Sequence, residues 1–193
     1  MSRQPLTGTG TPEDADLARR RTRAGAGSAY QDALRRLARR DHSEAELRRA
    51  LDRKGFPQDA IDRAVLRLRR AGHLDDPAFA RRFARRRMLV SGLGGSRVSA
   101  ELSARGVARS VAAAALLETL REVPERESLE TQARKYWRQR SREEPARRMR
   151  GLWRFLLRRG FPAELVSETL HALWPRWTLR LEPVEAPEGG TEA

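Results

Sequence analysis

The sequence contains no cysteine and no asparagine, and its three histidines, His42, His73 and His171, are scattered. The lack of cysteine excludes disulfide bonds, thiolate metal sites and a cysteine nucleophile. Three isolated histidines leave no expected metal cluster. No apolar run approaches the roughly 18 residues that a membrane helix needs, and the polar first residues do not look like a signal peptide. We therefore expect a cytoplasmic protein without a membrane segment.

Lysine is also almost absent, because 38 of the 40 basic residues are arginine. The formal net charge of +14 is large for 193 residues, and such a balance favours a polyanionic partner. Arginine- and alanine-rich coding would give the same composition without any such partner. The positions of the arginines must decide between these two interpretations.

One short phrase occurs three times along the chain. It is GFP at residues 55–57 and 160–162, and GVA at 106–108. The residues four and eight positions before each glycine are apolar, and this spacing places them on one face of a helix. These residues are Leu47, Leu51, Val98, Leu102, Leu152 and Leu156.

The glycine in each phrase is typical of a helix C-terminus, where the left-handed conformation is easy only for glycine. Pro57 and Pro162 suit the first turn of a following helix, because the missing N–H there has no intrahelical partner to lose. A second apolar stripe follows each phrase. The phrase therefore predicts a tight corner between two helices, used three times.

A further helix is expected before each corner, which completes a three-helix unit. These first helices are predicted at residues 28–40, from a cap at Asp76 onward, and at 127–140. Ser43 with Glu46 predicts a capping box at the next helix of the first unit. In the third unit, the second helix is expected to begin near Pro145, with Ser141 or Glu144 as its cap.

We predict an all-α protein, an elongated and curved array of three tandem three-helix repeats at residues 28–75, 76–122 and 123–180. Units of this size bury too little apolar surface to be secure alone, so neighbours are expected to stack. Residues 1–27 lack periodicity and predict a disordered extension. Residues 181–193 contain four glutamates and no basic residue, and they predict an acidic disordered tail.

The arginines fall into two classes by sequence spacing. In the first unit many have an acid one turn away, as in Asp32–Arg36, Glu44–Arg48 and Glu46–Arg49. Two groups have no such acid: RRFARRR at 81–87 and the i, i+4, i+8 series of Arg150, Arg154 and Arg158. Like charges one turn apart repel, by about 0.2–0.5 kcal/mol per pair. These two groups therefore favour contacts with an external anion over a merely solvated face.

Other candidate signals favour structural roles. The glycine-rich run at residues 91–96 has no phosphate-loop lysine and predicts a flexible joint. Asp75 and Asp76 predict a helix start rather than a magnesium site. Trp137, Trp153, Trp174 and Trp177 all lie in the last unit, where most are expected in the core and one could stack on a base. No catalytic group, cofactor site or metal site is predicted.

The order of the three units resembles the bacterial RecX regulators. The resemblance covers roughly residues 28–175, and the segments that carry it are LARRDHSEAELRRALDRKGF with HLDDPAFARRFARRR, then SRVSAELSARGV, then LLRRGFPAELVSETL. It departs at LGGSR, where the family often has a basic, proline-containing stretch. This departure leaves open the contacts made just before the second repeat.

The resemblance implies a negative regulator of the RecA recombinase. Such proteins bind along the groove of the RecA filament and limit its growth, ATP hydrolysis, strand exchange and co-protease action. We expect a monomer that contacts the RecA filament and single- or double-stranded DNA without sequence preference. The candidate contact residues are Arg39, Arg40, Arg81, Arg82, Arg85, Arg86, Arg87, Arg97, Arg150, Arg154, Arg158 and Arg159.

Two other functions remain open. Helix–turn–helix units also occur in sequence-specific transcription factors, but the absence of asparagine removes the usual reader of adenine. A purely structural scaffold, with arginines that serve only solubility, predicts no affinity for DNA or for RecA.

Overall fold

A computed structural model describes residues 28–175 of the chain. This part contains nine helical segments and no strand. Residues 28–39 form the first helix, and the other eight are α2 Glu44–Asp52, α3 Gln58–Arg70, α4 Asp76–Leu89, α5 Gly95–Ala104, α6 Arg109–Glu122, α7 Glu125–Gln139, α8 Pro145–Arg158 and α9 Ala163–Leu173. None of the described helices is long and apolar enough to span a membrane. The predicted extension 1–27 and tail 181–193 lie outside the described residues.

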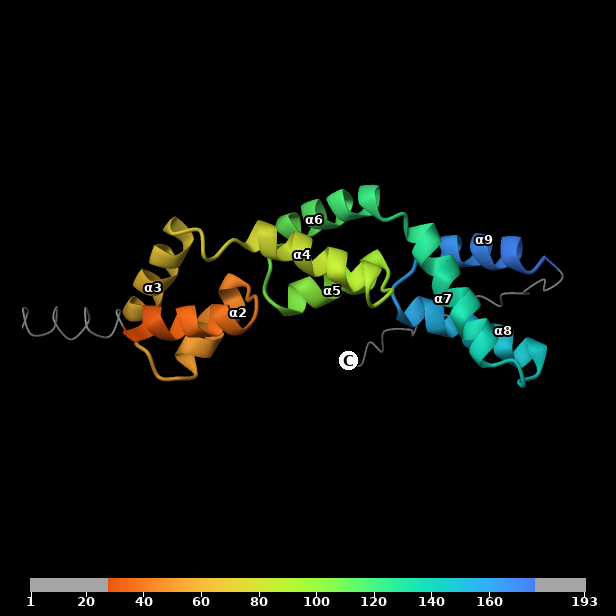
Figure 1. Ribbon diagram of the computed structural model, residues 1–193, viewed down its shortest axis with the longest axis horizontal. Helices are drawn as coiled ribbons and strands as arrows, with labels where there is room; N and C mark the ends of the chain where they lie inside the picture. Colours follow the sequence, from red (N-terminus) through yellow and green to blue (C-terminus); the bar gives the residue numbers. More distant parts are fainter. Residues whose placement is uncertain (1–27, 176–193) are drawn as a thin grey trace, which may run out of the picture.

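The helices form three groups of three along an elongated, bent array (Figure 1). We call these groups unit 1 (residues 28–75), unit 2 (76–122) and unit 3 (123–175). The buried apolar side chains form separate clusters, and each cluster draws on one unit only. The predicted architecture is therefore confirmed, whereas the predicted limits of the units as separate domains stay predictions.

The three glycine corners have the predicted conformation. Gly55, Gly106 and Gly160 have φ values of 85°, 82° and 87°. In each corner the residue after the glycine donates its N–H to the carbonyl oxygen five residues earlier, at 3.1–3.3 Å, as in a Schellman motif. The six apolar residues predicted before the corners are all fully buried. At roughly 1.5–3 kcal/mol for each buried large aliphatic side chain, they anchor the units.

Two of the three predicted side-chain caps are confirmed. Ser43 and Glu46 form the predicted capping box, and Glu144 caps α8 by accepting from the amides of Ala146 and Arg147. The expected cap at Asp76 is wrong. Asp75 caps α4, and the Asp76 carboxylate instead accepts from the Glu44 N–H at 2.8 Å. Asp76 thus ties the start of unit 2 to the start of α2 in unit 1.

Neighbouring units meet through the corners. The Arg105 carbonyl, just before Gly106, accepts from the Ser43 hydroxyl at 2.6 Å. The Arg159 carbonyl, just before Gly160, accepts from the Gly94 N–H at 2.9 Å. Ser43 and Gly94 are the N-caps of α2 and α5. In both junctions, the corner of one unit therefore docks on the N-terminus of the middle helix of the preceding unit.

The expected flexible joint at residues 91–96 is wrong, because this run forms the packed junction between units 2 and 3. Gly92 and Gly94 are buried. A Cβ atom on Gly94 would lie 2.4 Å from the Gly160 carbonyl group, and the Gly95 N–H donates to Glu125 at 2.6 Å. Glycine is needed here because two backbones approach closely.

Candidate anion-binding surface

The five arginines of residues 81–87 lie on α4, and most of them have carboxylate partners on other segments. The Arg82 guanidinium lies 2.8 Å from Asp41, and Arg81 lies 3.8 Å from Glu118. Arg85 pairs with Glu122, and Arg87 pairs with Glu101 at 2.6 Å. The prediction that this group lacks partners is therefore wrong for four of its five members. Only Arg86 has no ion pair within the described residues.

The physical reason lies in the packing of α4 against α6 and α5. This packing brings Glu118, Glu122 and Glu101 to the sides of α4, although they are 14–37 residues away in sequence. Three of the four α4 pairs are largely exposed, with half or more of the Arg82 and Arg85 side chains open to solvent, whereas the Arg87–Glu101 pair is part-buried. Exposed pairs contribute only about 0–1 kcal/mol each. Their guanidinium groups thus remain open to competition from an external anion.

Arginines also line the junction between units 1 and 2. A hollow of about 380 Å³ there is lined by Arg40, Asp41, Phe79, Arg82, Phe83, Arg86 and Arg105. Arg105, which the sequence analysis did not select, lies over the Phe83 ring at 4.7 Å and pairs with Glu46 at 2.5 Å. Arg105 precedes Gly106 as Arg159 precedes Gly160, so aligning the repeats would have identified it.

Glu46 is the charged centre of this junction. It accepts from the Ser43 N–H at 3.2 Å and pairs with Arg105 and, at 3.4 Å, with Arg40. Burial raises the pKa of Glu46, but the Ser43 bond and the two arginines outweigh it, so the pKa lies below its ordinary value. The expected Glu46–Arg49 pair is wrong, whereas the Asp32–Arg36 and Glu44–Arg48 pairs are confirmed at 2.8 and 2.9 Å.

A second basic hollow, of about 250 Å³, opens beside the first in unit 1. It is lined by Arg36, Arg40, His42, Glu46, Arg49, Ala50 and Arg53. Three of these arginines were not among the candidates. Arg36 and Arg49 were assigned by sequence spacing to Asp32 and Glu46, and Arg53, which follows the last residue of α2, was not selected. Together the two hollows give a concave, mainly basic surface on both sides of Arg40.

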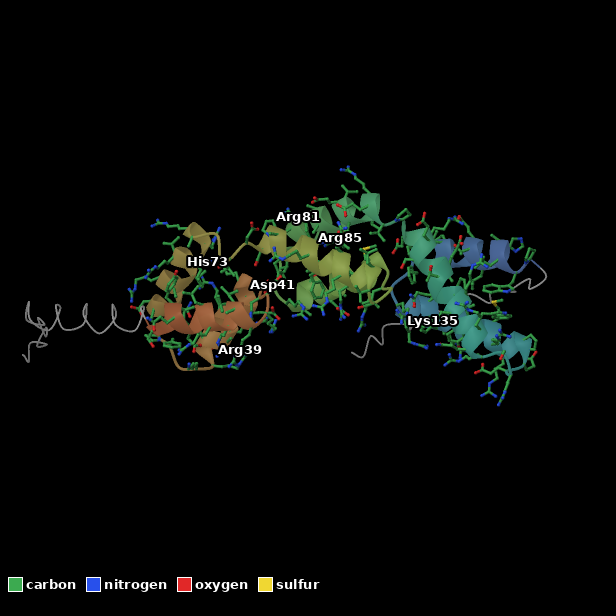
Figure 2. The ribbon with its side chains drawn as sticks, viewed as in Figure 1. Arg39, Asp41, His73, Arg81, Arg85 and Lys135 are labelled. Atoms are coloured by element: carbon green, nitrogen blue, oxygen red, sulfur yellow. The ribbon has the colours of Figure 1, made fainter. Side chains whose placement is uncertain are left out.

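The remaining candidate arginines have different surroundings. Arg159 is half-buried, bonds to the carbonyl oxygens of Ser91 and Gly92, and lies over the Phe155 ring; burial lowers its pKa. Arg97 pairs with Glu101 at 3.4 Å. Arg39 is exposed on unit 1, well apart from Arg81 and Arg85 on unit 2 (Figure 2). The candidates are therefore spread along the array and form no single cluster.

On α8, Arg150, Arg154 and Arg158 are all exposed. Within residues 28–175 none of the three has a carboxylate oxygen within the 4.0 Å of an ion pair. The prediction of an unpaired basic stripe thus holds on α8, although it fails on α4.

The aromatic and acidic candidates have structural positions. Trp137, Trp153 and Trp174 pack against the unit 3 core, with the Trp137 and Trp174 rings 4.7 Å apart. Trp177 lies outside the described residues. The part of the chain that the structure describes holds no group of three or more His, Asp or Glu placed to bind a metal ion.

The sequence matches models of all three RecX domains in order. The first, second and third three-helix domains match residues 29–68, 75–116 and 124–170. Together these matches cover well over half of the chain.

Two curated relatives and one solved structure are similar to this chain, and all three carry the RecX name. The "Regulatory protein RecX" of Pseudomonas putida is 36% identical over 135 residues, 69% of this chain and 83% of that protein. The protein of the same name from Geobacillus kaustophilus is 36% identical over 144 residues, 74% of this chain but only 52% of that protein.

The crystal structure of RecX from Lactobacillus salivarius shows the same fold. It matches with a TM-score of 0.69 at 21% identity, over 78% of this chain and 97% of that one. With all three domains matched in order, and with relatives named as regulatory proteins, this chain belongs to the RecX family.

Proposed function

We propose that this protein binds the RecA nucleoprotein filament and thereby restrains RecA ATP hydrolysis, strand exchange and co-protease activity. The observation that carries the proposal is the bent array of three units with exposed arginines along its whole length. A helical filament offers a long groove with protein carboxylates and nucleic-acid phosphates. An elongated partner can contact several filament subunits at once.

The proposed mechanism is inhibition by binding alone. Each exposed guanidinium gives a weak and salt-sensitive contact, but contacts on linked units raise one another's effective concentration. Arginine suits such contacts because its planar guanidinium binds carboxylate or phosphate through two hydrogen bonds. Binding then shifts the filament, by mass action, toward the form that this protein prefers.

Contacts with phosphate carry no base information, so DNA binding is expected to be sequence-neutral and strongly salt-dependent. A preference for one selected DNA sequence over random DNA, preserved at high salt, would instead support a transcription factor.

The proposal predicts inhibition of purified RecA. ATP hydrolysis by RecA on excess single-stranded DNA is measured with this protein at substoichiometric amounts. We expect a lower rate that further single-stranded DNA does not restore, because the target is the filament. An unchanged rate would contradict the proposal, and a rate restored by added DNA would show that the protein only covers DNA.

A further inference from the structure

The exposed face of α8 differs from every other arginine-rich face in the described part of the chain. Its arginines lie at positions i, i+4 and i+8 and form no ion pair with a described residue, whereas α4 has carboxylates on both sides. The nearest acid before the row in sequence, Glu144, uses its two carboxylate oxygens for the amides of Ala146 and Arg147 at 2.9 and 2.8 Å. These two hydrogen bonds lower the pKa of Glu144, and the Arg150 charge adds to the effect, so this carboxylate already has its partners.

The geometry of α8 sets the spacing of these charges. At a rise of 1.5 Å per residue, successive arginines are separated by about 6 Å along the axis. The opposite side of α8 is fixed by the buried Met149, Leu152 and Leu156, so the three guanidinium groups must face outward together. Such a row fits an anion that repeats its charge at regular intervals.

An aromatic ring borders the row. Trp153 is next to Arg154 in sequence and half-buried, with part of its ring against the unit 3 core. An anchored, partly exposed ring is a surface on which a base can stack. A nucleic-acid strand combines phosphates at regular intervals with flat rings that can stack on an aromatic side chain, so it matches both features of this surface.

We propose that Arg150, Arg154 and Arg158 form the strand-binding surface of this protein, which contacts the phosphates of a single nucleic-acid strand beside Trp153. On α4, four of the five arginines already hold carboxylates that an incoming phosphate would have to displace, whereas the α8 row needs no such exchange, so we assign the strand contact to α8. The assignment rests on the proposed function, since it places the nucleic-acid contact of a filament-binding protein in unit 3.

The test is the salt dependence of binding by the full chain. Fluorescence anisotropy of labelled oligo(dT) is measured between about 50 and 200 mM salt. Each phosphate contact with a single strand contributes about 0.7 to the slope of log K against log salt. The combined change Arg150→Gln, Arg154→Gln and Arg158→Gln is therefore expected to reduce the slope by about 2.

A matched control removes three arginines of unit 3 that have acidic partners: Arg126→Gln, Arg134→Gln and Arg140→Gln, which pair with Glu168, Glu130 and Glu143. The control has the same net charge as the α8 variant, and its slope is expected to stay near that of the wild type. Circular dichroism checks that both variants keep their helix content.

Four results would overturn the assignment. The α8 variant could keep the wild-type slope, or the control could lose as much slope as the α8 variant. The combined change Arg81→Gln, Arg82→Gln and Arg85→Gln could reduce the slope more than the α8 variant does, or the wild-type chain could bind duplex DNA more tightly than oligo(dT). Inhibition of RecA by the wild-type chain separates the two proposals. If inhibition persists while the strand-binding result fails, only this assignment is wrong. If inhibition is also absent, the proposed function is wrong as well.

Discussion

At the scale of single residues, chemically identical side chains differ by their surroundings. Arg148 is buried and bonds to the Trp137 carbonyl with its guanidinium over the Trp137 ring, whereas Arg154 is exposed and has no ion pair with any residue between 28 and 175. A buried arginine must find acceptors or ring faces, because an unpaired buried charge is costly. An exposed arginine keeps its solvation and can exchange water for a ligand.

His42 gives a prediction at this scale. Burial lowers the pKa of His42 below its ordinary 6.5, Arg40 and Arg36 add to the effect, and a bond to the Arg40 carbonyl and the Glu46 charge oppose it. As pH falls through the unfolded value of about 6.5, the unfolded chain takes up this proton first, so the native state loses stability.

We therefore expect the free energy of unfolding to fall between about pH 7 and pH 5.5. The free energy of unfolding of the His42→Gln variant should fall less over the same pH range, as measured by urea denaturation at each pH. The two proteins have the same carboxylates, so the difference between their pH profiles is due to His42. Parallel pH profiles would show that burial does not perturb this histidine.

Pairing of single residues was the part that sequence spacing could not predict. The i, i+4 rule found Asp32–Arg36 and Glu44–Arg48, because the geometry of one helix fixes these pairs. It missed Glu118 and Glu122 beside α4, because their position depends on how α6 packs. A stripe without local acids is therefore only a hypothesis until its neighbouring helices are known.

At the scale of elements, the glycine corner has two separable requirements. One is the positive φ, which is almost equal at Gly55 and Gly106. The other is space: a Cβ atom on Gly106 would lie 2.4 Å from the Ala45 Cβ atom, whereas nothing lies within 4 Å of one on Gly55. Sequence spacing predicted the first requirement. The second arises from the docking of unit 2 on α2, which the pattern within one unit does not contain.

Alanine at each corner separates these requirements. Gly55→Ala should destabilise by about 1–2 kcal/mol, the cost of a left-handed non-glycine residue. Gly106→Ala should cost more, because the same strain is joined by a clash between units. Chemical denaturation measures both values. Equal losses of stability would mean that the junction between units 1 and 2 shifts to accommodate the added methyl group at no cost. No loss at Gly55→Ala would contradict the left-handed conformation assigned to the corner.

At the scale of the whole molecule, each unit has its own apolar cluster, and polar contacts join neighbouring units. Helical periodicity predicted the three units, because each buries its own apolar cluster. It could not predict their relative placement, which depends on single groups such as the Arg105 carbonyl, the Asp76 carboxylate and the backbone of Gly94. The role of the glycine-rich run was predicted wrongly for the same reason, because the backbone that it packs against belongs to unit 3.

The curvature of the array should therefore depend on charge. Two ion pairs bridge units 1 and 2. Arg82–Asp41 is exposed, whereas Arg105–Glu46 is part-buried, with only 14% of the Glu46 side chain open to solvent. Salt therefore screens the first pair more strongly than the second. Arg82→Gln with Arg105→Gln should leave each unit folded but loosen the junction. Small-angle X-ray scattering should then show a changed radius of gyration at low salt, close to that of the wild type at high salt.

The control for this change is Arg63→Gln with Arg126→Gln, which removes ion pairs that lie inside units 1 and 3. Its scattering should match the wild type, because neither pair joins units. If the junction variant also scatters like the wild type at every salt concentration, the hydrogen bonds that Ser43, Glu44 and Arg49 of unit 1 donate to unit 2 hold the bend without the ion pairs. The shape presented to a filament would then be fixed by backbone docking rather than tuned by charge.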